Sequence, residues 1–408
     1  MKNPFLSLKY RNFRIYWVGM NLSLIGSWMQ VIALPWLTLI ITNDPFKVSL
    51  VATLQFAPAL LFTLFSGAIL DRFNKKAVLA FAQIGMMIIA FIFAFMVFTD
   101  SCSFERILIF SFINGVFNSI DAPSRQSMVY DLIDDRENLP NAIALNSVSF
   151  NTARILGPSL AGIIMAVFGV GYCFLFNGVS FFAILISLYF IKLKTEQKAQ
   201  NSEPLHIFKS IKEGFIYVLH KQILSEVLLI LLIIATFVPN YNITVSAFVK
   251  FVLQGGEKTF GYMMACSGVG AFVGAFFVAS FGKFEIKYIR ILSVVSVLLL
   301  SCIGLVSNFY YACFVLALTG FAFLLTASNI NSTLQLNTAN EFRGRVMSIY
   351  TLVFQGSTPF GALFAGYFTD KFGAKFGFIM CGMTSVFLLL LLFKSLNLKR
   401  IHKTKKNL

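Results

Sequence analysis

The sequence predicts an all-α polytopic membrane protein with twelve transmembrane helices in two pseudo-symmetric six-helix bundles. Of its 408 residues, 58% are hydrophobic and only 12% are charged, and the mean hydropathy is +0.79. A soluble globular domain carries about 25% charged residues. The apolar runs approach the roughly 20 residues that a spanning helix requires. A single long polar interruption divides these runs into six and six.

Twelve apolar stretches could each cross a bilayer as a helix. The strands of a membrane barrel would be about 10 residues long with alternating polarity, which these stretches do not show. The predicted spans are approximately residues 15–41, 48–70, 77–98, 107–127, 142–167, 172–191, 222–247, 258–281, 289–307, 309–331, 346–368 and 376–396.

The polar interruption defines the predicted domains. Residues 192–221 separate an N-terminal bundle (1–191) from a C-terminal bundle (222–396), and residues 397–408 form a basic tail. Apolar residues recur every three or four positions inside the linker, at Ile207, Ile211, Phe215 and Val218. This spacing predicts an amphipathic helix along the inner membrane surface.

Glycines repeat between the two halves at a constant offset of 204 residues. The matching pairs are Gly162 with Gly366, Gly169 with Gly373, and Gly178 with Gly382. Glu137 and Glu341 share the offset, each just before the fifth helix of its half. Such matches are expected of parallel six-helix repeats.

The net charge of +16 would favour nucleic acid in a soluble protein, but membrane topology explains it better. With the N-terminus cytoplasmic, 26 of the 33 basic residues fall on the cytoplasmic side and six on the other, with Arg154 inside a span. This asymmetry predicts that both termini are cytoplasmic. The basic tail then anchors the last helix against anionic lipid of the bilayer, and no nucleic-acid partner is expected.

A dense charge cluster, Gly67-Ala68-Ile69-Leu70-Asp71-Arg72-Phe73-Asn74-Lys75-Lys76, lies between the second and third spans. It resembles the loop signature of major facilitator superfamily transporters, roughly G-x-L-A-D-R-x-G-R-K, with Asn74 in place of a glycine. The stretch Arg154-Ile155-Leu156-Gly157-Pro158-Ser159-Leu160-Ala161-Gly162 resembles the helix 5 motif of proton-driven exporters. Together with Asp121–Arg125, Asn141–Ser147 and Phe342–Ser348, it is similar to the branch that holds enterobactin exporters and macrolide efflux pumps.

The resemblance implies the major facilitator fold and a conformational lock in the charged loop. By this resemblance, Asp71 locks the outward-closed state by contacting the start of helix 11, whose N-terminal amides favour an anion. Lys75 is the expected charge-relay residue, and Asp121 or Arg125 could complete its network. The predicted lock residues are Gly67, Asp71, Arg72, Lys75 and Lys76. The alternative is a solvated surface loop whose basic residues only reflect the excess of positive charge on the cytoplasmic side.

Ionisable residues inside the predicted spans are few, and a charge at the bilayer centre costs at least ~2.5–3.5 kcal/mol. Asp121, Arg154 and Glu226 qualify, and Arg125 lies at the inner end of helix 4. Arg154 could pair with Asp121, bind an anionic substrate or reach the inner surface. Glu226 is expected to be interfacial. These four residues are the coupling candidates, with Asp121 first.

Polar residues on apolar helices are the candidates for a substrate cavity. Some of them are expected only to bond neighbouring helices. The candidates are Asn21, Gln30, Gln55, Asn114, Asn118, Asn240, Tyr241, Asn329 and Gln355. Pro239 beside Asn240 predicts a break in helix 7.

Small residues let helices approach closely where no hydrophobic drive joins them. By the resemblance, helix 5 faces helix 8 and helix 2 faces helix 11, so glycines on these helices would lie where the halves meet. Ordinary static packing is the alternative for each of them. The predicted interface residues are Gly157, Pro158, Gly162, Gly268, Gly270, Gly274, Gly361 and Gly366.

These features favour a secondary active transporter that exports small hydrophobic or amphipathic molecules, drugs or siderophores, by proton antiport. An uptake permease for a small polar nutrient is the alternative. Enzymatic chemistry is disfavoured because HExxH, GxSxG and phosphate-loop motifs are missing, and neither a metal nor another cofactor is expected. The predicted protein is a monomer of a bacterial cytoplasmic membrane, with a small molecule and protons as its partners.

The lock predicts the effect of one substitution. Asp71→Asn should abolish transport without lowering the amount of protein in the membrane, because an amide lacks the charge that a helix N-terminus favours. Membrane immunoblots and transport assays on the same cells test this. Normal transport by a well-expressed variant would contradict the lock.

Overall fold

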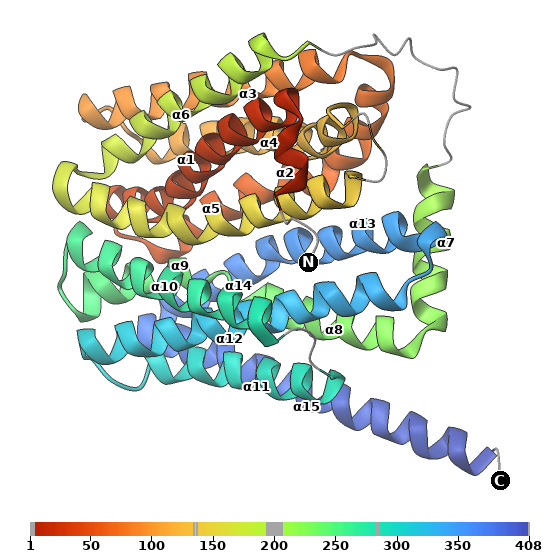
Figure 1. Cartoon of the computed structure of the whole chain (residues 1–408). Helices are drawn as coiled ribbons and strands as arrows, with labels where there is room; N and C mark the ends of the chain where they lie inside the picture. The colour runs from red at the N-terminus through yellow and green to blue at the C-terminus, as the bar shows by residue number, and fades with distance from the viewer. Residues whose placement is uncertain (1–4, 134, 136–137, 193–206, 282–284, 407–408) are drawn as a thin grey trace. The chain divides into compact units, whose positions relative to one another are not determined.

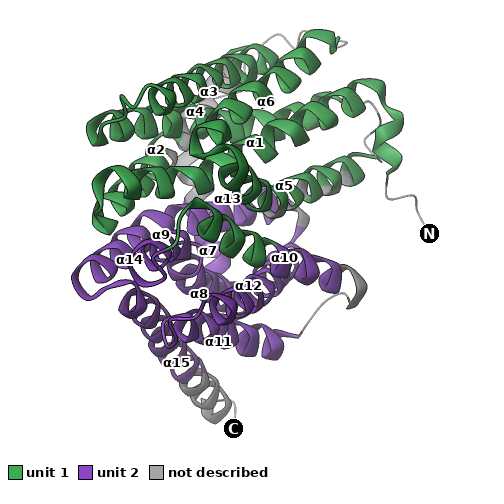
Figure 2. Cartoon of the chain, turned by 90° about the vertical axis from the view of Figure 1, so that its left-hand side faces the viewer, with its two compact units in different colours: residues 1–205, 255–268 green, residues 206–254, 269–408 purple. Residues whose placement is uncertain are grey.

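A computed structural model gives the fold (Figure 1). It describes residues 5–133, 135, 138–192, 207–281 and 285–406. Within its helices, some side chains lie outside the description: those of residues 59–60, 63–72, 140, 144, 147, 151, 155, 207–211, 279–281, 340 and 397–406. The chain forms two compact units, coloured separately in Figure 2. Unit 1 comprises Met1–Leu205 with Gly255–Gly268, and unit 2 comprises His206–Gln254 with Val269–Leu408.

The first half of the chain is a bundle of long helices. After a 3-10 turn at Leu6–Lys9, they are α1 (Arg11–Thr42), α2 (Pro45–Arg72), α3 (Lys75–Phe98), α4 (Phe104–Asp131), α5 (Leu139–Phe168) and α6 (Val170–Phe190). Helix α1 packs on α5 and α6, α3 packs on α4 and α6, and α2 packs on α4.

The second half begins with the linker helix α7 (Ile207–His220). The helices that follow are α8 (Gln222–Phe237), α9 (Tyr241–Ala247), a π-helical turn at Phe248–Val252, α10 (Glu257–Phe281), α11 (Ile286–Ile303), α12 (Phe309–Asn337), α13 (Asn340–Gly356), α14 (Thr358–Phe372) and α15 (Ala374–Lys406). The interruption between α8 and α9 includes Pro239, which confirms the predicted break in helix 7.

Nine helices in the described part of the chain are long and apolar enough to cross a membrane. They correspond to the first, third, fifth to tenth and twelfth predicted spans. The fourth predicted span, α4, is outside these nine and carries an internal acid–base pair, Asp121 and Arg125. The eleventh is divided between α13 and α14 at Ser357, next to Pro359 in the first turn of α14. Proline supplies no amide donor to the preceding turn, which explains the division. Much of the second span, in α2, lies outside the described side chains.

The two halves repeat the same helix pairings. Helix α3 packs on α4 and α6 in the first half, and α11 packs on α12 and α15 in the second. The glycines predicted to be equivalent also match in backbone conformation. Gly169, between α5 and α6, has φ +97° and ψ 166°, and Gly373, between α14 and α15, has φ +85° and ψ 161°. This region of backbone space is essentially restricted to glycine.

The predicted linker helix forms as α7, and one side of it is buried against protein. Val218 is buried, whereas Phe215 is 40% exposed. Gly214 and Val218, four residues apart, share the buried side, and α7 packs on α13 and α8. The helix is therefore held by protein contacts within unit 2, and not by a membrane surface alone.

The backbone conformation of Gly373 predicts that a substitution there destabilises the fold through strain alone. An added Cβ there would meet no atom within 4 Å, so Gly373→Ala introduces conformational strain without a clash. We expect the free energy of unfolding to fall by about 1–3 kcal/mol, as measured by denaturation of the purified protein in detergent. The matched control is Gly344→Ala, which also has open space but lies inside α13, where alanine is favoured. Equal effects of the two substitutions would contradict the backbone argument.

Candidate functional site

Four polar side chains from three helices close a hydrogen-bonded ring inside unit 1. Arg125 donates from Nε to Asp121 Oδ2 at 2.6 Å and from Nη2 to Ser23 Oγ at 3.1 Å. Ser23 Oγ donates to Gln83 Oε1 at 3.1 Å, and Gln83 Nε2 donates to Asp121 Oδ1. The ring joins α1, α3 and α4, and each of its residues is at most 6% exposed. We call these four residues the buried ring.

Local helix geometry explains the ion pair at the centre of the ring. Asp121 and Arg125 are one turn apart on α4, with the acid on the N-terminal side, so their side chains share a face. Pairing offsets part of the cost of removing both charges from water. Arg125 Nη1 has no hydrogen-bond partner among the described residues, so the ring retains one unused buried donor.

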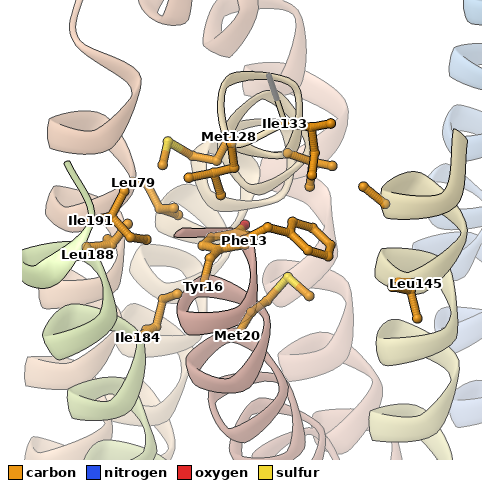
Figure 3. Packing of buried hydrophobic residues seen from close by; sticks show 13 residues of the cluster. Phe13, Tyr16, Met20, Leu79, Met128, Ile133, Leu145, Ile184, Leu188 and Ile191 are labelled. Atoms are coloured by element: carbon orange, nitrogen blue, oxygen red, sulfur yellow. The ribbon is translucent and has the colours of Figure 1, made fainter. Parts of the chain in front are cut away.

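An apolar cluster adjoins the buried ring (Figure 3). Tyr16 connects the two, because its ring is fully buried in the cluster and its hydroxyl donates to the Arg125 backbone carbonyl at 3.0 Å. Phe13, Met20 and Met128 pack in the same cluster. These contacts fix the Arg125 backbone at the point where its side chain enters the ring.

Unit 2 contains a second buried acid–base pair. Arg290 Nε on α11 donates to Glu226 Oε1 on α8 at 2.5 Å, and the Phe393 ring lies 5.5 Å from the guanidinium. Glu226 is 0% exposed, so protein encloses it, and its predicted interfacial depth in the membrane stays a prediction. Its place near the start of α8 suggested exposure, and Arg290 was not identified as its partner. Glu226 Oε2 and Arg290 Nη2 lack partners within the described structure.

The charged loop also pairs differently from the prediction. Lys75 Nζ donates to both carboxylate oxygens of Asp131 at 3.0 Å, so neither Asp121 nor Arg125 completes its network. Asp131 ends α4, beyond the apolar run, and was therefore missed. Lys76 Nζ donates to the Ile191 carbonyl at 2.9 Å. The side chains of Gly67, Asp71 and Arg72 lie outside the described residues, so the lock itself stays a prediction.

Asn74, which replaces the usual glycine of the loop signature, has a clear structural role. Its side-chain oxygen accepts from the Lys76 amide at 2.9 Å and from the Ala77 amide at 3.3 Å. It is therefore the N-cap of α3. The cap fixes the start of α3, and with it the backbone from which Lys75 reaches Asp131.

The coupling candidate Arg154 lies half-buried on α5. In the described hydrogen bonds, the Asp121 oxygens accept from Arg125 and Gln83 and not from Arg154. Sequence spacing could have identified Arg125 as the partner, since it lies one turn from the acid. Gln83 gave no comparable signal, because it comes from a different helix.

Three of the cavity candidates are buried and bonded within their own unit. Asn177 Nδ2 donates to Gln30 Oε1 at 2.6 Å, which ties α6 to α1. Asn240 Nδ2 donates to the Thr236 and Thr358 carbonyls at 2.7 and 3.2 Å, and Asn329 Nδ2 donates to the Leu325 carbonyl at 2.8 Å. These amides contribute to helix packing.

The other cavity candidates are half-buried or exposed. Asn21 donates to the Trp17 carbonyl at 2.6 Å. Half-buried positions are taken by Asn21, Gln55, Asn114, Tyr241 and Gln355, while Asn118 is exposed. Their role in a substrate cavity stays a prediction.

Most predicted interface glycines contact a helix of their own unit. An added Cβ at Gly157 would clash with Trp28 on α1, and one at Gly361 would clash with the Thr236 carbonyl on α8. Gly270 and Gly274 approach Ala317 and Phe321 on α12. The close contacts at these four positions lie within one unit, and the role of these glycines where the halves meet stays a prediction. Pro158 lies inside the continuous helix α5, and Gly268 and Gly366 are buried.

The first part of α10 contacts α1 and α5 within unit 1. An added Cβ at Gly162 would lie 2.8 Å from the Gly261 Cα, so the backbones of α5 and α10 nearly touch there. Trp36 stacks on Phe260 with ring centroids 5.0 Å apart.

Two repeated six-helix halves are a feature of the major facilitator fold. Solved structures support this fold. A point mutant of the nucleoside transporter NupG matches with a TM-score of 0.70 and 14% identity, covering 96% of this chain and 99% of that one. The chain belongs to the transmembrane secretion effector family, which it matches over residues 2–407. This is a family of transporters and not of enzymes.

Characterised relatives include transporters of two kinds. The chain is 24% identical to the staphyloferrin A transporter of Staphylococcus aureus, covering 89% of this chain and 90% of the relative. It is 21% identical to the multidrug efflux pump Tap of Mycolicibacterium fortuitum, covering 89% and 92%. The chain is thus a multi-pass membrane transporter related to siderophore and multidrug transport proteins.

The buried ring predicts a specific pattern of stabilities. Asp121→Leu should lower the free energy of unfolding by about 3–5 kcal/mol, because it leaves the Arg125 charge buried and uncompensated. Adding Arg125→Met should restore most of this loss, since an apolar pair of similar volume replaces the ion pair. Denaturation of the purified variants in detergent measures both, with the exposed Glu105→Gln on α4 as control. A double variant less stable than Asp121→Leu would contradict the account.

Proposed function

We propose that this transporter exports small hydrophobic or amphipathic molecules, of drug or siderophore type, in exchange for protons. The observation that carries the proposal is the buried ring, which holds an ionisable carboxylate inside the membrane-spanning bundle. The relation to multidrug efflux pumps supports the outward direction. The helix 5 sequence around Gly157 and Pro158, similar to that of proton-driven exporters, supports it as well.

The ring provides a chemical basis for proton coupling. Asp121 balances the Arg125 guanidinium at 2.6 Å. A proton on Asp121 removes that balance and leaves a buried cation with a weaker partner, which is unfavourable in a medium of low dielectric. A conformation that admits water or substrate to Arg125 relieves this cost. Proton binding and conformation are thereby linked.

The Glu226–Arg290 pair is a second coupling candidate of the same chemistry. Its carboxylate is fully buried and one oxygen has no partner among the residues that the structure describes. The Phe393 ring beside Arg290 offers the guanidinium an alternative contact when Glu226 is neutral. Arg154 remains the candidate for contact with an anionic substrate.

The cargo inferred from composition is apolar or amphipathic. The chain contains 48 Phe and 13 Met, which give a polarizable interior that adapts to varied shapes. The half-buried and exposed polar candidates, including Gln55, Asn114 and Gln355, would supply the few hydrogen bonds that orient a ligand. The setting we infer is a bacterial cytoplasmic membrane, with a monomer whose termini both face the cytoplasm.

The export proposal predicts a substrate-dependent proton signal. Inverted membrane vesicles that contain the protein are energised, and a fluorescent dye reports the internal pH while amphipathic drugs and siderophores are added one at a time. At least one compound should release protons, because each cycle exchanges cargo for protons. A panel without any pH response would contradict antiport, and accumulation of a polar nutrient by whole cells would favour uptake.

Two neutral substitutions identify the coupling acid. Asp121→Asn should reduce the proton signal at least about tenfold, because the amide cannot exchange a proton at neutral pH. Glu226→Gln tests the second pair, and Glu105→Gln, an exposed acid on α4, is the matched control that should leave the signal unchanged. A full signal from both Asp121→Asn and Glu226→Gln would exclude these carboxylates as the coupling groups.

A further inference from the structure

Helix α7 lies against the turn between α12 and α13 in unit 2 (Figure 1). Tyr217 of α7 and the residue that follows the helix, Lys221, both reach the backbone of that turn. Lys221 Nζ, just after the helix, donates to the Asn337 carbonyl at 3.2 Å, and the Tyr217 hydroxyl accepts from the Ala339 amide at 3.0 Å. Ala339 precedes α13 and offers no capping side chain. Tyr217 therefore satisfies a backbone donor at the start of α13 that the local sequence leaves open.

Four side chains form a continuous stack across this contact. Tyr217 lies parallel to Phe342, with ring centroids 4.3 Å apart and an interplanar angle of 7°. Lys221 Nζ lies 4.7 Å from the centre of the Tyr217 ring, and the Arg345 guanidinium lies 5.2 Å from the centre of Phe342. Each ring thus has a cation associated with it, an arrangement that attracts through the ring quadrupoles.

An ion pair and a close approach complete the contact. Arg345 Nη1 lies 2.7 Å from Glu213 Oε2, so the guanidinium that interacts with Phe342 also binds α7 directly. Gly214 faces Arg345, and a Cβ added at Gly214 would lie 3.1 Å from the Arg345 Cβ. Glycine at this position lets α7 approach α13 closely enough for the stack to form.

We propose that the segment Phe342–Arg345 is a docking site for α7, and that the docked helix holds the start of α13 in place throughout the transport cycle. The residues in the contact act as positioning residues. This role explains the Phe342-Arg343-Gly344-Arg345 sequence, which the transport mechanism does not otherwise use. The inference rests on the chain being a transporter, but not on the direction of transport or on protons.

Hydrogen–deuterium exchange of the full-length protein in detergent tests docking without any substrate. Phe342→Ala should speed amide exchange in α7 by about threefold to tenfold, the range that one stacked aromatic pair supports. Arg345→Glu should also speed exchange. Adding Glu213→Arg should restore part of the parent protection, because the ion pair re-forms with reversed charges while the Arg345 cation beside Phe342 stays absent. Arg343→Gln is the control, since Arg343 is exposed. Unchanged α7 exchange in both Phe342→Ala and Arg345→Glu would overturn docking.

A reversible cross-link tests whether α7 stays docked during transport. In a variant without the native cysteines, Gly214→Cys and Arg345→Cys introduce Cβ atoms close enough for a disulfide, whose Cβ atoms lie about 3.8 Å apart. The reduced form should transport several-fold more slowly because it lacks the Arg345 contacts, and oxidation should restore the rate. An inactive oxidised form, or a reduced form as active as the parent, would overturn the proposal. The rate is measured with any compound that gives a transport signal. If no compound does, the hydrogen–deuterium exchange experiment is the test of docking.

Discussion

The Asp121–Arg125 pair is a buried constraint that ties together three helices of unit 1. A carboxylate and a guanidinium buried among apolar helices require partners for their remaining hydrogen-bonding groups. Gln83 and Ser23 supply these partners from α3 and α1, so the positions of three helices depend on one ring. Tyr16 then connects the ring to the apolar cluster of the bundle. The same helix positions therefore pack the apolar side chains and satisfy the buried charges.

The helices themselves and their repetition could be predicted from sequence, because hydropathy and glycine are local signals. The offset between Gly169 and Gly373 identified two turns whose backbone conformations agree closely. Partners across helices could not be predicted in the same way. Asp131 lies beyond the apolar run and Arg290 comes from a different helix than Glu226, so hydropathy gave no reason to pair either. Arg125 alone, one turn from Asp121, could have been assigned from spacing.

For helix α7, the apolar spacing predicts that a helix forms but not what its faces contact. The apolar period predicted the helix, but it could not distinguish a face that binds lipid from one that binds protein. Gly214 and Tyr217 were not part of the apolar pattern, yet they make the close contacts with α13. A glycine and an aromatic ring on one side of an amphipathic helix favour packing against protein, and a hydropathy pattern does not include this signal.

The two buried ion pairs, Asp121–Arg125 and Glu226–Arg290, each join residues of a single unit. A rigid-body rotation of one unit against the other would leave such pairs intact. Asp121 and Glu226 would then keep their arginine partners through the cycle, and what changes is their access to water. A carboxylate that water reaches can exchange a proton with it, whereas one sealed among apolar helices cannot. In the antiport we propose, proton exchange would then require only that water reach the buried ring in one conformation and not in the other.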